Sequence, residues 1–589
     1  MYLEKINGPD DVKKLNLEEL NILAEEVREG LFNRLTKFGG HFGPNFGFVE
    51  ATIAMHYVFN SPKDKFVFDV SHQTYPHKML TGRAYGYIDN DRMAEISGYS
   101  APEESEHDHF IIGHTSTSVS LACGLAKGRD LKGDNENIVA VIGDGSLSGG
   151  EALEAFDFAG SELNSNLIII VNDNQQSIAE NHGGLYKNLE ELRNGTAKTN
   201  LFTAFGLDYV YEADGNNIEK LIELFKKVKD IDHPIVVHIN TIKGKGYKIA
   251  EENREDWHWC MPFNKETGEP TISFGDGEDY LDLTANLLLE KIQKDNKVVA
   301  VAAGVPTSFG FTEDKRIKAG KQFVDVGIAE ENAVGLISGI AKNGGKPVFG
   351  TNATFIQRTY DQISQDLCVN NNSATIVLGF TSVWGLNDVT HLGIFTISAF
   401  SHIPNLLILA PTNRQEYLSM LDWSVEQNEH PVMILIPGNG VINDAREGVK
   451  NYSDCINKFK VEQKGEKVAI IAAGDFYQIG EEAVKIIEEQ LGYKPTLINP
   501  RFVNDLDKEC LDNLKQNHSL VITLEDGIID GGFGQKVASY LGTSNLKVKN
   551  FGLNKEFYDR YDADKLLEIL GITPEKISEY VKENIKITN

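Results

Sequence analysis

The stretch Ile138-Val-Ala-Val-Ile-Gly143-Asp144-Gly145-Ser146 decides the fold, because five apolar residues run directly into a polar, glycine-containing turn. A second run of the same kind, Leu167-Ile-Ile-Ile-Val, ends in Asn172-Asp173-Asn174. Continuous apolar, mainly β-branched runs of this length are typical of strands that are buried on both faces, as in parallel sheets. The two runs therefore predict neighbouring parallel strands whose polar turns meet at one edge of a sheet.

Similar apolar runs recur along the rest of the chain, with amphipathic segments between them. Further strands are predicted at residues 234–239, 297–301, 374–378, 405–409, 432–436, 467–471 and 520–523. Helical spacing of apolar residues predicts helices at residues 217–228, 414–426 and 479–490. Strands that alternate with helices predict an α/β fold with mostly parallel sheets.

Two polar stretches divide the chain into three consecutive α/β domains. Residues 264–279 contain Gly and Pro among polar residues, and residues 437–466 precede a new strand at Lys467. We therefore predict domains at residues 1–270, 280–445 and 460–589.

Composition excludes several classes of function. The 589 residues include 57 Lys plus Arg and 86 Asp plus Glu, a net charge of −29, which argues against nucleic acid as a partner. The five cysteines are far apart, which favours reduced thiols in a cytoplasmic protein. No signal peptide or run of about 18 apolar residues is present, so no membrane association is expected.

The two polar turns favour a site for a phosphorylated ligand. Ligands of open α/β sheets bind outside the carboxyl ends of the strands, where Asp144 and Asn174 are expected to meet. A carboxylate and an amide oxygen suit Mg²⁺, which keeps further ligands from the phosphates of a substrate. Gly145 would let a diphosphate approach the backbone, although Gly-Asp-Gly alone is a common turn.

With these turns and several longer motifs, the chain resembles the 1-deoxy-D-xylulose-5-phosphate synthase family of transketolase-like enzymes. The turns match the thiamine-diphosphate motif of the transketolase group. The most specific match is Asp69-Val-Ser-His72-Gln-Thr-Tyr-Pro-His77-Lys-Met-Leu-Thr-Gly-Arg83. Other matches are Gly-Gly-His41-Phe, Gly113-His114-Thr115-Ser116, Lys243-Gly-Lys-Gly-Tyr247, Asp325-Val-Gly-Ile-Ala-Glu330, Thr354-Phe355-Ile-Gln-Arg358 and Asn499-Pro-Arg501.

The resemblance implies a transketolase-like thiamine-diphosphate-binding fold with diphosphate-binding, pyrimidine-binding and C-terminal domains. It implies that Mg²⁺ is held by Asp144, Asn174 and the backbone carbonyl of Gln176. The cofactor would contact His72, Gly113, His114, Thr115, Gly145, Ser146, Asn174, Tyr247, Glu330 and Phe355. The catalytic residues would be Glu330, His41, His72, His258, His391 and Arg358.

The implied reaction joins pyruvate and D-glyceraldehyde 3-phosphate to give 1-deoxy-D-xylulose 5-phosphate and CO2, a step of isoprenoid biosynthesis. Glu330 would protonate the aminopyrimidine ring, against which Phe355 would stack. Glu330 lies in an apolar-rich stretch, so burial is expected to raise the pKa of its carboxyl. A homodimer acting on small-molecule substrates is implied as well.

Any single histidine of this set has the alternative of a structural role, and we expect His77 to be a packing residue. The acidic stretch 103–106, followed by His107 and His109, is expected to be a solvated loop and not a metal cluster.

Several residues depart from the family pattern where the acceptor substrate is expected. Phe380 and Gly438 replace two arginines that we would assign to the acceptor phosphate, Asn387 replaces an aspartate and Asn352 a tyrosine. Arginine binds phosphate through a bidentate fork that neutral side chains do not reproduce. Two alternatives therefore stay open: a paralogue that uses a different, including an unphosphorylated, acceptor, and a non-catalytic relative.

Overall fold

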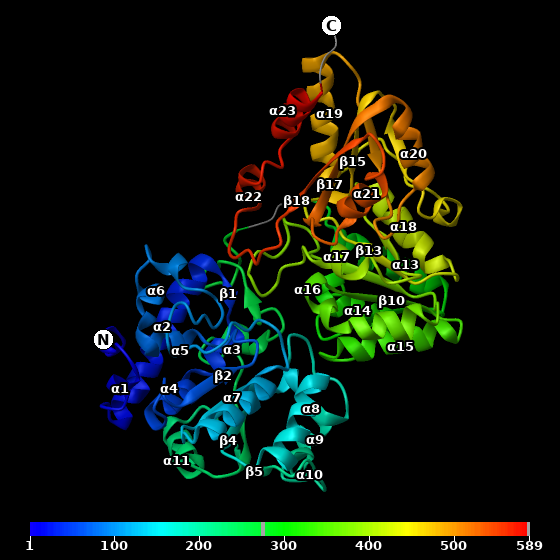
Figure 1. Cartoon of the computed structure of the whole chain (residues 1–589). Helices are drawn as coiled ribbons and strands as arrows, with labels where there is room; N and C mark the ends of the chain where they lie inside the picture. The colour runs from blue at the N-terminus through cyan, green and yellow to red at the C-terminus, as the bar shows by residue number, and fades with distance from the viewer. Residues whose placement is uncertain (273–276, 586–589) are drawn as a thin grey trace. The chain divides into compact units, whose positions relative to one another are not determined.

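The computed structural model describes residues 1–272 and 277–585, so residues 273–276 of the predicted linker 264–279 lie outside the described residues. The described chain forms two compact units. Unit 1 comprises the residues up to 272 together with Gly327–Ala329, and unit 2 comprises the other described residues. Three mostly parallel sheets of five or six strands confirm the predicted α/β class (Figure 1).

Unit 1 is built on a five-stranded parallel sheet. Its strands, in spatial order, are β2 (Lys65–Phe68), β3 (Ile138–Gly143), β4 (Leu167–Asp173), β6 (Pro234–Asn240) and β5 (Asp208–Glu212). Successive residues of β3 alternate between two hydrophobic cores: Val139 and Val141 enter one, and Ala140 and Ile142 the other. Both faces of the sheet are buried, and this explains the uninterrupted apolar run.

Helices cover both faces of this sheet. The helix α11 (Ile218–Val228) is capped by the Asn217 side chain, which accepts a hydrogen bond from the backbone N–H of Lys220. The long helix α2 (Leu17–Phe38) begins with a capping box formed by Asn16 and Glu19. On the other face, α7 (Ser118–Lys132) packs against β3 and ends at Gly133 in the left-handed conformation.

Unit 2 contains two sheets. The six-stranded sheet has the order β12 (Leu407–Leu409), β13 (Val432–Leu435), β11 (Thr375–Gly379), β10 (Lys346–Asn352), β8 (Val298–Ala302) and β9 (Phe323–Asp325). The five-stranded sheet has the order β14 (Lys460–Gln463), β16 (Thr496–Asn499), β15 (Lys467–Ala472), β17 (His518–Ile528) and β18 (Lys547–Leu553). The two sheets share one hydrophobic core, which includes Phe349, Ile376, Ile471 and Val521.

Each of the predicted apolar runs forms a strand, and α11, α18 (Arg414–Glu426) and α19 (Tyr477–Leu491) lie where helices were predicted. Strands β2, β5, β9, β10, β16 and β18 were not among the predicted runs. Strand β14 was missed as well, because three of its four residues are polar and the strand is partly exposed and paired antiparallel at the edge of the sheet. The boundaries of the three predicted domains stay a prediction. None of the helices in the described ranges combines the length and apolar character needed to cross a bilayer.

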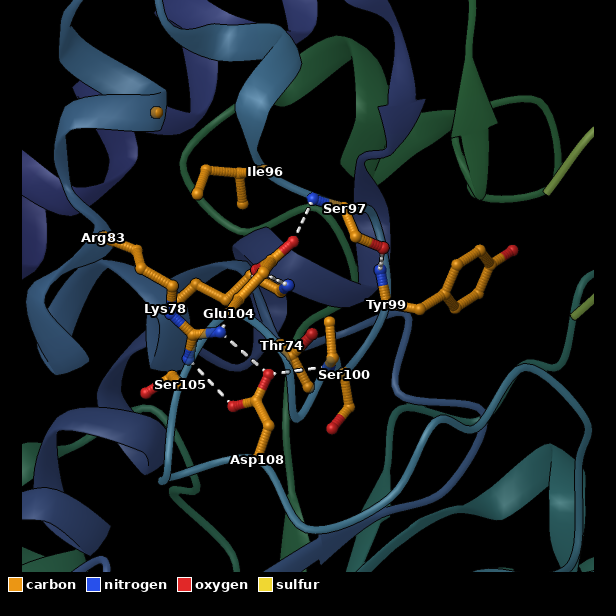
Figure 2. A network of polar contacts seen from close by, with 12 residues as sticks. Thr74, Lys78, Arg83, Ile96, Ser97, Tyr99, Ser100, Glu104, Ser105 and Asp108 are labelled. Carbon is orange, nitrogen blue, oxygen red and sulfur yellow. Dashed lines mark hydrogen bonds and ion pairs between the residues drawn. The ribbon is translucent and has the colours of Figure 1, made fainter. Parts of the chain in front are cut away.

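The acidic stretch 103–106 is not a simple solvated loop, which corrects the expectation from sequence. Glu104 pairs with Lys78 at 2.6 Å and with Arg83 at 3.2 Å. Arg83 also forms a bidentate pair with Asp108 at 2.8 Å, and Figure 2 shows these four side chains converging. Lys78 is completely buried, and burial lowers the pKa of its ammonium group to about 8.

His77 belongs to the same network: it is buried, and its two ring nitrogens link Asp108 to His56. Its Nε2 lies 3.0 Å from Asp108, and its Nδ1 lies 2.9 Å from Nε2 of His56. Burial lowers the pKa of His77 to about 4. Although burial alone would raise the pKa of Asp108, Arg83 and His77 hold it well below its ordinary value. The network ties residues 97–108 to the segment that follows His72.

Replacing Arg83 by Met should destabilise unit 1 by about 3–5 kcal/mol, because two buried carboxylates lose their shared cation. Arg92→Met is the control: its ion pair with Glu95 is about half exposed and should contribute about 0–1 kcal/mol. Calorimetric unfolding of the two variants measures the difference. Equal transition temperatures for both would contradict a stabilising role for the network.

Candidate functional site

The carboxyl ends of β3 and β4 bring Asp144 and Asn174 together, as predicted. Gly143 pairs with Asn172 in the parallel register, so both chains leave the sheet at the same edge. Asp144 is 1% exposed and accepts a hydrogen bond from the backbone N–H of Asn174. The Nδ2 of Asn181 donates to the Asp144 carboxylate at 2.7 Å.

This edge of the sheet is rich in oxygen atoms and poor in compensating charge. Burial, and secondarily the nearby Asp173, raises the pKa of Asp144 to about 8. The side-chain oxygens of Asn181 and Ser177 are buried and accept no hydrogen bond in the described structure. A desolvated carboxyl beside unsatisfied neutral oxygens suits a hard divalent cation such as Mg²⁺, so the donor set fits the metal that the resemblance implies.

Lys243 supplies a positive charge that acts on Asp144 at this edge. Its Nζ donates to the carbonyl of Ser177 at 2.6 Å, and burial lowers the pKa of Lys243 to about 7. Gly145 approaches Ser177 so closely that a Cβ would lie 2.9 Å from the Ser177 side chain. Only glycine fits this approach without a shift, which keeps the turn after β3 narrow.

The loop of residues 113–115 lies next to the turn after β3. Ser116, which follows the loop, has a φ of 74° and donates through Oγ to the carbonyl of Ser146 at 2.8 Å. The predicted contact segments around Gly113 and Gly145 are therefore linked directly within unit 1.

Three of the predicted histidines form one cluster. The ring centroids of His41 and His72 are 5.0 Å apart, and His258 lies 5.6 Å from His41 and 5.4 Å from His72. Burial, followed by Lys243 and the other two histidines, lowers the pKa of His258 well below its ordinary value. His258 is therefore neutral at pH 7, and its ring can donate one hydrogen bond and accept another.

Asn45, which the sequence analysis did not identify, positions this cluster. Its Nδ2 donates to the carbonyls of His41 and His72, each at 2.7 Å, and its Oδ1 accepts from the backbone N–H of Tyr75 at 2.9 Å. Asn45 is completely buried. No motif flagged it, because an asparagine that bridges two backbone segments has no sequence signature of its own.

Tyr247 occupies an aromatic core in the structure. Its ring contacts Phe32, Phe42 and Trp257, and its hydroxyl donates to the carbonyl of Lys265 at 2.9 Å. The structure thus gives Tyr247 packing contacts, and its predicted contact with the cofactor stays a prediction.

The predicted acid of unit 2 is Glu330, the first residue of α15 (Glu330–Lys342). It is 3% exposed, and burial raises the pKa of its carboxyl to about 7, as the sequence predicts. The Nη1 of Arg358 lies 3.5 Å from Oε2 of Glu330 and partly opposes this rise. At neutral pH a proton on Glu330 is therefore available for transfer.

Phe355 and His391 lie together in the same unit. Their ring centroids are 5.8 Å apart in an edge-to-face arrangement, and Thr354 donates to the carbonyl of Thr390 at 3.3 Å. The Nδ1 of His391 lies 2.7 Å from the Thr390 hydroxyl. Glu330, Arg358, Phe355 and His391 thus come from three segments that are distant in sequence, and all four lie in unit 2.

Among the residues that depart from the family pattern, Asn387 and Gly438 have hydrogen-bond partners in the structure. Phe380 adopts a φ of 56°, and Asn387 donates through Nδ2 to the carbonyl of Tyr561 at 2.7 Å. Gly438 donates its backbone N–H to Asp475 at 2.7 Å, and a Cβ there would lie 2.6 Å from Cβ of Ser382. Asn352 is 7% exposed, and its Oδ1 accepts no hydrogen bond in the described structure.

Two buried acidic residues lie close to the segment that contains Gly438. Asp475 and Asp526 line a cavity of about 20 Å³, and Ser382 donates to Asp526. Burial raises the pKa of Asp475 to about 6 and that of Asp526 to about 8.

The connection between Ile178 and Phe202 contains a helix, α9 (Gly184–Arg193). Its last residue, Arg193, forms an ion pair with the buried Asp173 at the end of β4. The connection is thereby fixed to the same sheet edge that carries Asp144.

Asn45→Ala should lower the free energy of unfolding of unit 1 by about 2–4 kcal/mol, because buried backbone groups lose their partners. Asn21→Ala is the matched control: Asn21 donates to the carbonyl of Leu17 on an exposed helix face. Thermal unfolding measures both, and equal losses would show that Asn45 does not hold the histidine segments.

The chain matches three family models over almost its whole length. Residues 3–199 and 189–241 match the model described as 1-deoxy-D-xylulose-5-phosphate synthase. Residues 278–440 match the transketolase pyrimidine binding domain, and residues 457–577 match the transketolase C-terminal domain.

Curated relatives extend the similarity across the whole chain. A 1-deoxy-D-xylulose-5-phosphate synthase from Clostridium beijerinckii is 36% identical over 98% of this chain and 99% of its own length. The enzyme of that name from Alkaliphilus oremlandii is 36% identical over 99% of both chains. These names do not favour a paralogue with a different acceptor. The chain belongs to the 1-deoxy-D-xylulose-5-phosphate synthase family of thiamine-diphosphate-dependent transferases, which use the cofactor with a divalent metal such as Mg²⁺.

Proposed function

We propose that the chain converts pyruvate and D-glyceraldehyde 3-phosphate into 1-deoxy-D-xylulose 5-phosphate and CO2; the relatives named above are synthases of that product. The observation that carries the proposal is the buried Glu330, whose pKa of about 7 suits a residue that transfers protons at neutral pH. When bound, thiamine diphosphate supplies the carbanion chemistry of decarboxylation and carbon–carbon bond formation.

In unit 1 the proposed metal ligands are Asp144, Asn174 and the backbone carbonyl of Gln176. The burial of the Asp144 carboxyl, which raises its pKa, supports this assignment, because a bound cation would offset its desolvation. The proposed contacts of the diphosphate are Gly113, His114, Thr115, Gly145 and Ser146, which lie on two directly linked segments.

In unit 2 the proposed role of Glu330 is to hold and donate a proton to the aminopyrimidine ring, with Phe355 as the apolar face on which that ring stacks. Arg358 and His391 are proposed to bind oxygen atoms of the substrates. Arg358 then carries the recognition of a substrate anion, since Phe380 and Gly438 offer no charge.

The histidine cluster of unit 1 is proposed to move protons and bind substrate oxygen atoms. The low pKa of His258 supports a neutral imidazole, which donates one hydrogen bond and accepts another. His41 and His72 are proposed to share this work, since Asn45 holds both of their backbone segments.

The proposal includes a cytoplasmic homodimer, as the family resemblance implies. Analytical ultracentrifugation of the purified protein measures the assembly, and a sedimentation coefficient of a 65.3 kDa monomer at assay concentration would contradict it.

Glu330→Gln should lower the turnover of pyruvate and glyceraldehyde 3-phosphate by about 10²- to 10⁴-fold, because the amide cannot supply the proton. Chromatographic detection of deoxyxylulose phosphate measures the loss. Glu313→Gln is the control, since Glu313 is an exposed carboxylate in the first turn of another helix, α14 (Glu313–Ala319). A wild-type protein that binds the cofactor but forms no deoxyxylulose phosphate would contradict the proposed reaction.

The same variant should change how stability depends on pH. The pKa of Glu330 is about 7 in the folded protein and about 4.5 when unfolded, so the folded state binds more protons between these values. Stability of the cofactor-free protein therefore falls as pH rises from about 4.5 to 7, by about 3 kcal/mol for this group. Urea unfolding at several pH values should show a weaker fall in Glu330→Gln, and an unchanged profile would contradict the burial argument.

A further inference from the structure

Asp69, to which neither the motifs nor the family resemblance assigned a role, occupies a central position among the proposed cofactor contacts. It directly follows β2, and its backbone N–H extends the sheet by donating to the carbonyl of Val141 at 2.8 Å. Its side chain is 1% exposed. The carboxylate is thus held at the carboxyl edge of the sheet, where Asp144 and Asn174 also lie.

Hydrogen bonds from three serines converge on this carboxylate. The backbone N–H groups of Ser116 and Ser118 donate to Oδ1 and Oδ2 at 2.9 and 3.0 Å. The Ser146 side chain donates to it as well. Asp69 is therefore hydrogen-bonded both to the end of the loop 113–115 and to the turn that contains Gly145. These are the two segments proposed to bind the diphosphate.

Ser71 holds the opposite end of the same loop. Its Oγ donates to the carbonyl of Ile112 at 2.6 Å and accepts from the backbone N–H of Ser100 at 2.8 Å. Asp69 and Ser71 thus fix the chain on both sides of residues 113–115. The segment with Ser100 is itself anchored, since Ala101 donates to Asp108 in the ion network of Figure 2.

The backbone between these residues is strained. Val70 and Ser71 adopt φ values of 56° and 63°, in the left-handed region that a β-branched residue such as valine rarely enters. Such strain persists only where surrounding contacts over-determine the conformation, and it clusters at ligand sites. The strained turn leads directly into His72. The side chains of Asp69 and Ser71 therefore set the backbone position of His72 as well as that of the loop 113–115.

We propose that Asp69 is a positioning residue that holds the loop 113–115 and Ser146 in the arrangement that binds the diphosphate of the cofactor. The inference rests on the proposed function, because it concerns the same site. The carboxylate contacts no phosphate itself; it accepts hydrogen bonds from backbone and hydroxyl groups and so fixes the donors around it before the cofactor arrives.

Asp69→Asn tests this directly. The amide keeps the shape, but its Nδ2 cannot accept a hydrogen bond, so one of the two backbone N–H groups loses its partner. The chain offers a matched control in Asp64, a buried aspartate at the opposite end of β2. Asp64 accepts the backbone N–H groups of Asn60 and Asn137 at 2.7 and 2.8 Å. Asp64→Asn removes an equivalent bond far from the carboxyl edge of the strand.

Both variants should lose comparable thermal stability without cofactor, but only Asp69→Asn should bind thiamine diphosphate more weakly. With Mg²⁺ present, calorimetric titration should give a Kd about tenfold higher, equivalent to about 1.4 kcal/mol. At saturating cofactor kcat should stay close to that of the wild type, since the reacting groups are intact. Equal Kd values for Asp69→Asn and the wild type would overturn the proposal and leave the proposed function standing.

The wild type provides a second measurement that needs no folded variant. In the cofactor-free protein the amides of Ser116 and Ser118 should exchange with deuterium as slowly as those of the sheet, because Asp69 already holds them. Rapid exchange that slows only after the cofactor binds would overturn the proposal. A wild type that binds no thiamine diphosphate would overturn both this proposal and the proposed function, whereas one that binds it but forms no product would overturn the function alone.

Discussion

When both faces of a parallel sheet are buried, polar side chains can reach a ligand at the edge where the strands end. The register of β3 and β4 sets that edge in unit 1: Gly143 pairs with Asn172, so Asp144 and Asn174 leave the sheet together. Every charged group at the edge is desolvated by the same packing that forms the sheet. The shifted pKa values of Asp144 and Lys243 are therefore consequences of the fold and not of the ligand.

The pKa values of the buried carboxylates described above are shifted in two opposite directions. Asp108 is paired with Arg83, and Asp173 interacts first with His238 and then with Arg193; these partners outweigh burial and lower both pKa values. Asp144 and Glu330 have no close ion pair of that strength, and their pKa values are raised. A raised pKa alone does not identify a functional group, however. Burial also raises the pKa of Glu525 to about 7, although two backbone N–H groups hold its carboxylate in a structural position.

Much of the fold was predictable, because apolar runs and helical periodicity report burial directly. The strands that contain residues 138–142 and 167–171, and the helix at residues 414–426, follow from those patterns. The short, polar edge strand β14 was not predictable, since it buries little. In the site, the motifs identified residues that would touch the cofactor. They did not include Asn45 and assigned no role to Asp69, because most partners of these two residues are backbone groups, which no side-chain pattern reports. The expectation of a solvated loop was wrong for Glu104, whose cationic partners Lys78 and Arg83 lie 26 and 21 residues earlier in the chain.

Gly438 limits how this chain could evolve or be engineered. Its N–H is held by Asp475, and the Ser382 side chain fills the space that a Cβ would need. An arginine introduced there would have to displace Ser382, and two acidic residues below would then compete for its guanidinium. Changes at positions 382 and 475 would have to come first. A single Gly438→Arg substitution would therefore not be accommodated without changes at these neighbouring positions.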